Sequence, residues 1–366
     1  ALPASAKTML EPLGVALVIA PWNYPALLAL SPAIGALAAG NALLVKPSEL
    51  APRTSALLAE LLPRHLDARA VAVIEGGVPE TTELLEQRFD TIFYTGNGRV
   101  GRIVAAAAAR HLTPVTLELG GKSPVYVDGT GDLAAAAERI VWGKYINAGQ
   151  TCVAPDYLLA SPEVAARLVP LLVEAVHARY GVHPDTNPDF ARIPDRARFD
   201  RLVPLLADGS AAVGGTADPE RLHVAPTILT GVARDAPIMQ QEIFGPILPI
   251  LEVDDLDDAI GIVNAGDKPL ALYVFSADPA VRRAWQTRTS SGAIAFDVPA
   301  VHLSVPGLPF GGVGESGTGA YHGVRSLRAF SHEKAVFAKP LKPDTLALFR
   351  PPYTERMEEI IRRIFR

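Results

Sequence analysis

Residues 12–45 read PLGVALVIAPWNYPALLALSPAIGALAAGNALLV and carry no charged side chain. A run of this length could cross a bilayer, which takes about 20 apolar residues in a helix. Prolines interrupt the run, however, and Asn23 and Asn41 would have to satisfy their amides in hydrocarbon. We therefore predict a buried strand, a turn and a buried helix rather than a membrane span.

Outward from this segment, apolar runs of strand length alternate with helix-like runs. The expected strands are Gly14–Ala20, Ala42–Val45, Val71–Ile74, Thr91–Tyr94 and Val115–Leu119. The expected helices between them are Ala26–Ala39, Thr54–Leu62, Thr81–Glu86 and Val100–His111. Such alternation is typical of a parallel sheet covered by helices on both faces. The first third of the chain is therefore predicted to be a doubly wound α/β domain.

After Gly120 and Gly121 the alternation starts again. The expected helices are Asp132–Ile146, Pro162–Arg179 and Asp195–Ala207, and the expected strands are Ile247–Leu251 and Leu270–Phe275. Beyond the glycine-rich segment Pro309–Gly319 we expect a helix at Val324–Phe330, an edge strand at Ala335–Ala338 and an amphipathic helix at Thr354–Arg366. The prediction is an α/β chain with domains at 1–119 (with 316–330) and 120–315, followed by a strand and tail at 331–366.

Composition narrows the class of protein. At 366 residues, two domains are the default expectation. The net charge of -5 and the 49% of hydrophobic residues are typical of a globular protein and argue against a nucleic-acid partner. A single cysteine permits no intrachain disulfide, so we expect a cytoplasmic protein. The histidines show no metal-ligand spacing, so no metal site is predicted. The chain starts at Ala1 without a methionine, and we expect that an N-terminal stretch is missing.

The single cysteine lies in an unusual place. A lone cysteine is more often a small buried hydrophobe than a nucleophile. Cys152 lies instead in NAGQTCVA, residues 147–154, a polar turn with a glycine between a helix-like run and a strand. In such a turn a thiol can be exposed to a cleft, and backbone amides can point at it. We therefore predict that Cys152 is a nucleophile.

The segment GQTC, residues 149–152, resembles the nucleophile motif of the aldehyde dehydrogenase superfamily, and its extension VAPDY, residues 153–157, resembles the class 3 branch. Further motifs resemble those of the family, in the family's order. They are PWNYP (21–25), KPSE (46–49), FYTGN (93–97), LELGGK (117–122), EIFGP (242–246) and PFGG (309–312). The resemblance covers nearly the whole chain. It implies the aldehyde dehydrogenase-like fold, with a small dimerisation strand element, and NAD(P)-dependent oxidation of an aldehyde to the carboxylic acid.

The resemblance also implies three catalytic side chains. Cys152 would form a thiohemiacetal and then a thioester, Asn23 would hold the oxyanion together with the Cys152 N–H, and Glu118 would activate the hydrolytic water. Glu118 has a competing interpretation, because GNGRVG at residues 96–101 has the spelling of a dinucleotide fingerprint and Glu118 lies about where the ribose-binding acid falls. The fingerprint would follow the fourth predicted strand rather than the first, and Glu118 adjoins the predicted domain junction. Both facts favour the catalytic role.

The same resemblance indicates where NAD or NADP would bind. Lys46 and Glu49 would meet the adenosine ribose, and the helix that Gly96 and Asn97 open would face the pyrophosphate. Most family members have serine at position 97 and threonine at position 98, so Gly98 adds flexibility here. The residues expected at the cofactor are Trp22, Lys46, Glu49, Gly96, Asn97, Gly101, Leu119, Glu242 and Phe244. Tyr24 and Phe310 are expected to line the substrate channel. The choice between NAD and NADP stays open.

Two alternatives remain. A CoA-acylating aldehyde dehydrogenase would resolve the thioester with a thiol, which Glu118 argues against, and an inactive family member would serve as a binding or structural protein. The resemblance implies a medium-chain aliphatic or aromatic aldehyde as substrate. It also implies a homodimer, with Ser123–Val127 and Ala335–Ala338 as strands suited to pairing across the interface. No membrane partner is expected, because the arginines of the C-terminal tail make it too charged to span.

Overall fold

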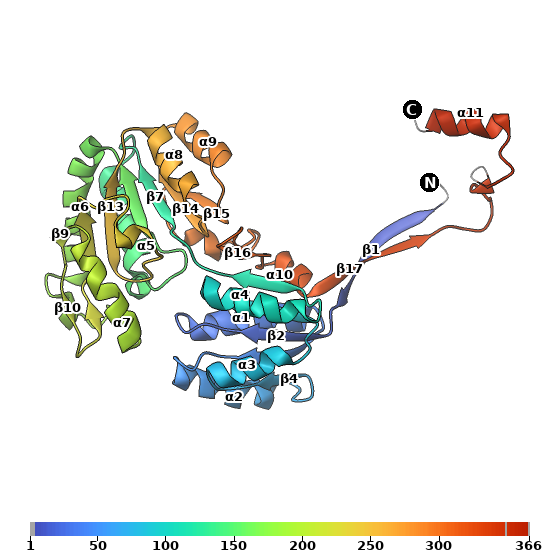
Figure 1. Cartoon of the computed structure of the whole chain (residues 1–366), viewed down its shortest axis with the longest axis horizontal. Helices are drawn as coiled ribbons and strands as arrows, with labels where there is room; N and C mark the ends of the chain where they lie inside the picture. The colour runs from blue at the N-terminus through green and yellow to red at the C-terminus, as the bar shows by residue number, and fades with distance from the viewer. Residues whose placement is uncertain (1–3, 348–349, 365–366) are drawn as a thin grey trace.

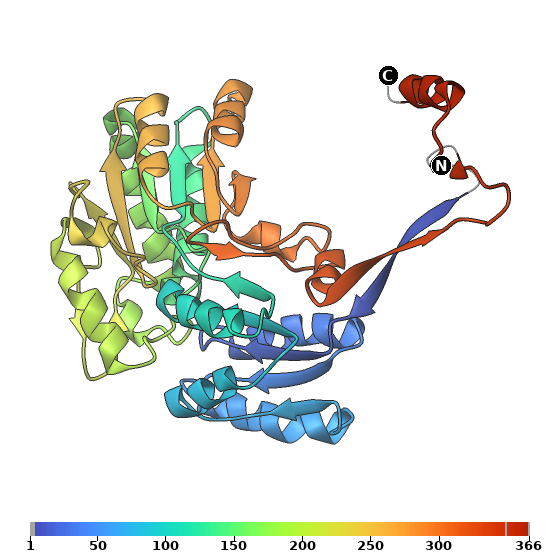
Figure 2. The ribbon, with the colours of Figure 1, turned by 45° about the vertical axis from the view of Figure 1, so that its right-hand side comes forward.

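A computed structural model describes residues 4–347 and 350–364 of the chain. Figure 1 shows two α/β lobes side by side and a long two-stranded ribbon that extends away from them. The view turned by 45° shows the same ribbon projecting into solvent, with the C-terminal helix near its far end (Figure 2). The architecture is therefore the expected pair of α/β units with an additional strand element.

The first lobe is built on a six-stranded sheet with the strand order β16-β6-β5-β2-β3-β4. All its neighbouring strands are parallel except β16, which runs antiparallel to β6. The strands are β2 (Val15–Ile19), β3 (Ala42–Lys46), β4 (Val71–Val73), β5 (Thr91–Thr95), β6 (Val115–Glu118) and β16 (Gly317–Thr318). The helices are α1 (Pro25–Ala38), α2 (Pro52–His65), α3 (Val78–Glu86), α4 (Gly98–Ala109) and α10 (Val324–Ala329). The predicted alternation of strands and helices in this region is confirmed.

The sheet of this lobe is covered on both faces. Along β2 the side chains alternate, so that Ala16 and Val18 join one hydrophobic cluster while Leu17 and Ile19 join another. The first cluster packs against α1, and the second packs against α3 and α4. This two-sided burial explains why β2 reads as a continuous apolar run.

Helix α1 departs from the prediction of a fully buried helix. It packs on the sheet through small residues, among them Ala29, Ala33 and Ala36, which are buried. Leu27 and Ile34 lie on the opposite side and are 63% and 66% exposed. The helix is therefore apolar all round but buried on only one face, a difference that its sequence cannot reveal.

The second lobe is built on a seven-stranded sheet with the order β15-β14-β7-β8-β13-β12-β9, parallel except for β9. Its strands are β7 (Pro124–Val127), β8 (Tyr157–Ala160), β9 (Ser210–Val213), β12 (Thr227–Thr230), β13 (Ile247–Glu252), β14 (Ala271–Phe275) and β15 (Ala293–Phe296). Its helices are α5 (Leu133–Tyr145), α6 (Pro162–Tyr180), α7 (Arg196–Leu202), α8 (Leu256–Ala265) and α9 (Pro279–Arg288). A small hairpin of β10 (Ala217–Asp218) and β11 (His223–Val224) lies outside the sheet.

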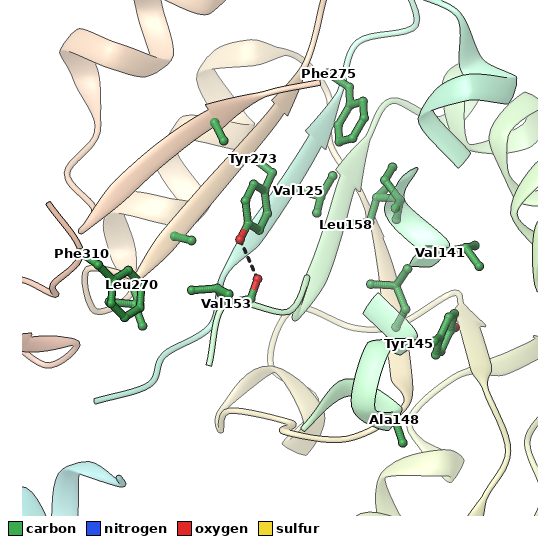
Figure 3. Close-up of a cluster of buried hydrophobic side chains, with 14 of the residues drawn as sticks. Val125, Val141, Tyr145, Ala148, Val153, Leu158, Leu270, Tyr273, Phe275 and Phe310 are labelled. Atoms are coloured by element: carbon green, nitrogen blue, oxygen red, sulfur yellow. Dashed lines mark hydrogen bonds between the residues drawn. The ribbon is translucent and has the colours of Figure 1, made fainter. Parts of the chain in front are cut away.

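Strand β7 corrects one prediction. Ser123–Val127 was expected to pair across a subunit interface, but β7 lies between β14 and β8 and is buried along its whole length. Val125 belongs to the cluster in Figure 3, together with Leu158 of β8, Tyr273 of β14 and Val141 of α5. A strand with neighbours on both sides has no free edge, so β7 is not available to a partner subunit.

The projecting ribbon consists of β1 (Ser5–Pro12) and β17 (Ser331–Ala338), paired antiparallel from Ser5 opposite Ala338 to Pro12 opposite Ser331. The edge strand expected at Ala335–Ala338 is thus confirmed and longer than predicted, whereas β1 was not anticipated. Beyond the ribbon, α11 (Glu355–Ile364) occupies most of the amphipathic helix expected at Thr354–Arg366, whose last two residues lie outside the described part of the chain.

Candidate active site

The loop that carries Cys152 has an unusual backbone. Helix α5 ends at Tyr145, and the 3-10 turn Ile146–Gly149 follows it directly. Asn147, Ala148 and Gly149 all have left-handed φ angles, at 51°, 52° and 73°. For an L-residue this conformation costs roughly 1–2 kcal/mol. The turn therefore stores strain immediately before the cysteine, as is common at functional sites.

Hydrogen bonds from the first lobe hold this strained loop. The Asn23 side-chain amide donates to the Gln150 carbonyl at 3.0 Å, and the Asn147 amide donates to the Asn23 carbonyl at 2.9 Å. The hydroxyls of Tyr24 and Thr151 share a further hydrogen bond of 2.7 Å. Residues 23 and 24 are thus brought from the start of α1 onto the loop of Cys152, although more than 120 positions separate them in sequence.

A buried tyrosine anchors the other side of the cysteine. The Tyr273 hydroxyl donates to the Val153 carbonyl at 2.6 Å (Figure 3) and accepts a hydrogen bond from the Ala300 amide at 3.3 Å. Val153 follows Cys152 directly, so Tyr273 of β14 positions the residue after the cysteine. Asn23 and Tyr24 position the residues before it. The sequence assigned Tyr273 no role, because an apolar strand pattern does not show which group a tyrosine hydroxyl will bond.

Glu118 ends β6 and is 2% exposed. Among the residues that the structure describes, neither of its carboxylate oxygens has a hydrogen-bond partner. Burial raises the pKa of this carboxyl well above its ordinary value, because desolvation disfavours the charged form. Burial of an acid without partners destabilises the fold, and acids with strongly shifted pKa values cluster at functional sites, so Glu118 is a strong candidate for a functional group.

The Cys152 thiol is partly buried and has no disulfide partner. Burial raises its pKa to about 12, and the nearby carboxylates of Glu242 and Glu118 raise it further, while the backbone amides of Cys152 and Val153 lower it. The three groups are therefore close enough to interact electrostatically. A thiol in this environment holds its proton at neutral pH.

Aromatic residues from the C-terminal part of the chain complete this side of the site. Phe310 is buried and stacks on His322 with ring centroids 5.4 Å apart, and Tyr321 meets Phe310 edge-on at 5.7 Å. Burial raises the pKa of Tyr321, and Glu118 and Cys152 raise it further. Phe310 thus lies among rings that contact the site, and Tyr321 is a neighbour that sequence reasoning missed.

Lys46 is the last residue of β3, and Glu49 follows it in the loop. Lys46 is buried, and its Nζ donates to the Pro47 carbonyl at 2.8 Å and to Glu49 Oε2 at 3.5 Å, whereas half of the Glu49 side chain is exposed. A lysine ammonium has three donors, so a buried one with a weak carboxylate contact retains capacity for a hydroxyl acceptor. The pair is therefore not an ordinary solvated surface ion pair.

Helix α4 begins after the loop at the end of β5. The Asn97 side chain accepts a hydrogen bond from the Val100 amide at 3.0 Å, so it caps the helix as expected. At the two neighbouring glycines a larger side chain would displace Tyr94 or Leu119. A Cβ on Gly96 would lie 2.2 Å from the Tyr94 hydroxyl oxygen, and one on Gly101 would lie 2.9 Å from Leu119 Cδ2.

Glu242 and Phe244 lie between α7 and the loop of Cys152. Burial raises the pKa of Glu242 to about 8, with a further contribution from Asp156. A Cβ on Gly120 would lie 2.3 Å from the Glu242 carboxylate, so a side chain there would displace that carboxylate. Phe244 has a φ of 45° and meets the edge of the Trp22 ring, with centroids 5.6 Å apart.

Helix α7 contributes residues that the sequence patterns did not single out. Arg198 lies 4.9 Å over the Trp22 ring, and Arg201 donates to the carbonyls of Glu242 and Ile243. Arginines on a short polar helix look like surface residues in a sequence. Lys122, which follows Gly120 and Gly121, donates to the Ile238 and Gln241 carbonyls and pairs with Asp156.

Within residues 4–347 and 350–364, no helix combines the length and hydropathy needed to cross a membrane. The same part of the chain contains no group of three or more His, Cys, Asp or Glu side chains placed to hold a metal ion.

Comparison with known proteins gives consistent results. The model of the aldehyde dehydrogenase family matches residues 3–336. Aldehyde dehydrogenase family 3 member A2 of Mus musculus is 51% identical over 94% of this chain and 72% of its own length. The mouse protein named "Aldehyde dehydrogenase, dimeric NADP-preferring" is 49% identical over 95% of this chain and 77% of its own length.

Solved structures agree with these sequence relatives. The structure described as "Substrate bound state of Staphylococcus Aureus AldH" superposes with a TM-score of 0.96 at 42% identity, covering 100% of this chain and 80% of that one. A Mycobacterium tuberculosis aldehyde dehydrogenase complexed with NAD+ superposes with a TM-score of 0.83 at 32% identity, covering 92% of this chain and 71% of that one.

Proposed function

The chain belongs to the aldehyde dehydrogenase family and is an NAD(P)-dependent aldehyde oxidoreductase, and we propose that Cys152, Glu118 and Asn23 are its catalytic residues. The observation that carries the proposal is the buried Glu118 carboxyl, whose oxygens have no hydrogen-bond partner in the described part of the chain and which interacts electrostatically with Cys152. Hydrolysis of a thioester on a nucleophile requires a base close to that nucleophile, and the base must be free of other hydrogen-bond donors.

The Cys152 thiol first gives its proton to solvent, and the thiolate sulfur then adds to the aldehyde carbonyl carbon, so that the carbonyl oxygen becomes a tetrahedral alkoxide. Asn23 supports this step, since its side-chain amide has two N–H groups and the Gln150 carbonyl accepts at 3.0 Å from that nitrogen. We assign the second N–H, with the backbone N–H of Cys152, to the alkoxide. A preorganised donor of this kind is typically worth about 3–4 kcal/mol in the transition state.

The residues around the site fit NAD or NADP. Buried Lys46 has donors to spare, the start of α4 presents backbone amides, and the Glu242 carboxyl raises the pKa of Cys152. When bound, the oxidised cofactor accepts the hydride that leaves the tetrahedral carbon, and its positive ring favours a nearby thiolate. The carboxylate of Glu49 favours an unphosphorylated ribose, yet it is half exposed and can turn away. Use of both cofactors is therefore proposed.

Glu118 completes the reaction. Loss of hydride leaves a thioester on Cys152, and Glu118 takes a proton from water as the oxygen adds to the acyl carbon. The C–S bond then breaks, the acid leaves, and the thiolate is restored. The raised pKa of Glu118 makes it a stronger base than an exposed carboxylate. Resolution by water rather than by CoA follows from this assignment.

The proposed substrate is a medium-chain aliphatic or aromatic aldehyde. We assign its channel to Tyr24, whose hydroxyl bonds Thr151 beside Cys152, and to Phe310, which stacks on His322. We also propose a homodimer joined through the β1–β17 ribbon, whose Met9, Leu10 and Phe337 are exposed. A related protein is named as dimeric. A reducing compartment such as the cytoplasm suits a reaction that depends on a free thiol.

A panel of aldehydes assayed with NAD and with NADP tests the proposed function. We expect reduced cofactor and carboxylic acid in equal amounts without added CoA, and no product from Cys152→Ala. The matched control is Cys152→Ser, which keeps a hydroxyl in place of the thiol and should retain only trace activity. Full activity in Cys152→Ala, or strict dependence on CoA, would contradict the proposal.

A further inference from the structure

The segment between the 3-10 turn Pro237–Met239 and β13 carries Glu242 and Phe244 but forms neither helix nor strand. Its carbonyls therefore cannot be satisfied by a regular hydrogen-bond ladder, and buried carbonyls need other partners. The left-handed φ of Phe244 makes the segment costly to hold in place.

Two cations supply the missing partners. Lys122 Nζ donates to the carbonyls of Ile238 and Gln241, both at 2.9 Å. Arg201 donates to the Glu242 carbonyl at 3.1 Å and to the Ile243 carbonyl at 2.5 Å. It also donates to Gln241 Oε1 at 3.1 Å. Lys122 thus holds the backbone that precedes Glu242, and Arg201 holds the backbone of Glu242 and of the residue that follows it.

The two cations differ in whether a carboxylate neutralises their charge. Lys122 forms an ion pair with buried Asp156, whose other oxygen accepts from the Ile243 amide at 2.9 Å. Arg201 forms no ion pair among the described residues. Its guanidinium donates instead to the backbone carbonyls of Glu242 and Ile243 and to the side-chain amide oxygen of Gln241. The planar fork of the Arg201 guanidinium presents two donors in a fixed geometry, which suits two carbonyls that are neighbours in the chain.

The segment that carries Glu242 and Phe244 is also packed between α7 and the loop of Cys152. A Cβ on Gly245 would lie 2.5 Å from Leu202 of α7, and a Cβ on Gly149 would lie 2.2 Å from the Gly245 oxygen. One turn earlier on α7, Arg198 lies over Trp22, which in turn meets Phe244. Helix α7 therefore contacts both the segment that carries Glu242 and the Trp22 ring that meets Phe244.

We infer that Arg201 is a positioning residue for the nicotinamide half of the cofactor. By fixing the carbonyls of Glu242 and Ile243, it orients the Glu242 carboxylate and the Phe244 ring toward that half, while Lys46 and Glu49 hold the adenosine half independently. The inference rests on the proposed roles of Glu242 and Phe244. It predicts that loss of Arg201 weakens one half of the binding site and spares the other.

The test compares binding of NAD and of ADP, which lacks the nicotinamide riboside, by calorimetry without aldehyde. For Arg201→Met we expect the Kd for NAD to rise about 10-fold or more, as loss of hydrogen bonds from a charged group suggests, and the Kd for ADP to stay unchanged. Arg201→Lys should give an intermediate rise. Arg196→Met is the matched control, because Arg196 also lies on α7 but pairs with Asp200 on the surface.

Equal weakening of NAD and ADP in Arg201→Met, or unchanged binding of both, would overturn the inference. If Arg201→Met fails to fold, Arg201→Lys decides, because it keeps the charge and the inference still requires a loss confined to NAD. These measurements need no turnover. A wild-type protein that binds NAD but oxidises no aldehyde would contradict the proposed function and leave the inference about Arg201 intact.

Discussion

Gly149 illustrates how a single residue sets the geometry next to Cys152. Its φ of 73° is left-handed, and a Cβ there would lie 2.2 Å from the backbone oxygen of Gly245. Both the turn before the cysteine and the segment that carries Glu242 therefore depend on the absence of a side chain at this position.

Replacement of Gly149 by alanine should lower the free energy of unfolding by at least about 1–2 kcal/mol, since the residue must adopt a left-handed φ and push back a neighbouring backbone. Activity should fall with it, because Cys152 lies three residues away. Denaturant unfolding and steady-state assays measure both effects. The control is Gly261→Ala in α8, which has open space around its Cβ and should stabilise the helix by about 0.5–1 kcal/mol. Equal effects from the two substitutions would contradict this account.

Glu118 makes stability depend on pH in a definite direction. Its pKa is raised in the folded protein, so between the unfolded and folded pKa values the unfolded chain has lost a proton that the folded chain keeps. Stability conferred by the protonated form is therefore lost as pH rises through that window, by up to about 1.4 kcal/mol per pH unit.

Glu118→Gln removes this titration, so the variant should gain stability over the wild type as the pH increases from about 5 to 8. Denaturant unfolding of the two proteins across this range gives the difference directly, and contributions from all other groups cancel. A difference that stays constant with pH would show that Glu118 titrates as an ordinary exposed carboxyl, contrary to its burial.

Motif residues were predictable from the sequence, but their connections were not. The segments that carry Asn23 and Cys152 were recognised individually, whereas the hydrogen bond from Asn23 to Gln150 depends on how the two lobes meet. The same is true of Tyr273, whose hydroxyl meets the Val153 carbonyl only once β14 has packed beside β7. Long-range contacts of this kind have no local signal in a single sequence.

At the level of elements, the α/β alternation was predictable because most strands are buried on both faces and read as apolar runs. Strand β1 was missed for the opposite reason. Almost all residues of β1 are exposed, so burial imposes no apolar periodicity on its sequence SAKTMLEP. Its pairing partner, β17, lies near the other end of the chain, so no local pattern indicates the pair. The apolar run of β7 did carry the signal of a central strand.

The N-terminus of α4 is the element on which the proposed pyrophosphate contact depends. Asn97→Ala removes the side chain that caps the Val100 amide and should cost about 1 kcal/mol of stability. It should also weaken NAD binding, because the first turn of the helix would fray. Calorimetry and thermal unfolding measure the two effects. Asn97→Ser, which can still cap, should restore both, and a serine variant no better than alanine would contradict this role for the cap.

The whole molecule is asymmetric in a way that suits assembly. The β1–β17 ribbon projects from the two lobes, and its pairing register places Leu10 and Phe337 on the same face. Both side chains are exposed in the single chain. A two-stranded ribbon without further support is marginal in water, so a second copy would stabilise it.

We expect the wild-type protein to be a dimer at micromolar concentration and the double substitution Leu10→Glu with Phe337→Glu to shift it toward monomer. Light scattering after size-exclusion chromatography measures the mass. Leu57→Glu on α2 is the control, because it places the same charge on another exposed leucine and should leave the dimer intact. A wild-type monomer, or a double variant that remains dimeric, would exclude the ribbon as the interface.

The assignment of Glu118 as the base that hydrolyses a thioester on Cys152 is tested most directly by a single-turnover measurement on Glu118→Gln. Stopped-flow detection of reduced cofactor, followed by intact-protein mass spectrometry, separates hydride transfer from hydrolysis. The account predicts a burst of about one equivalent per site, then a stall, with the acyl group retained on Cys152. Continued turnover at the wild-type rate, or a stalled variant with no acyl group on Cys152, would contradict it.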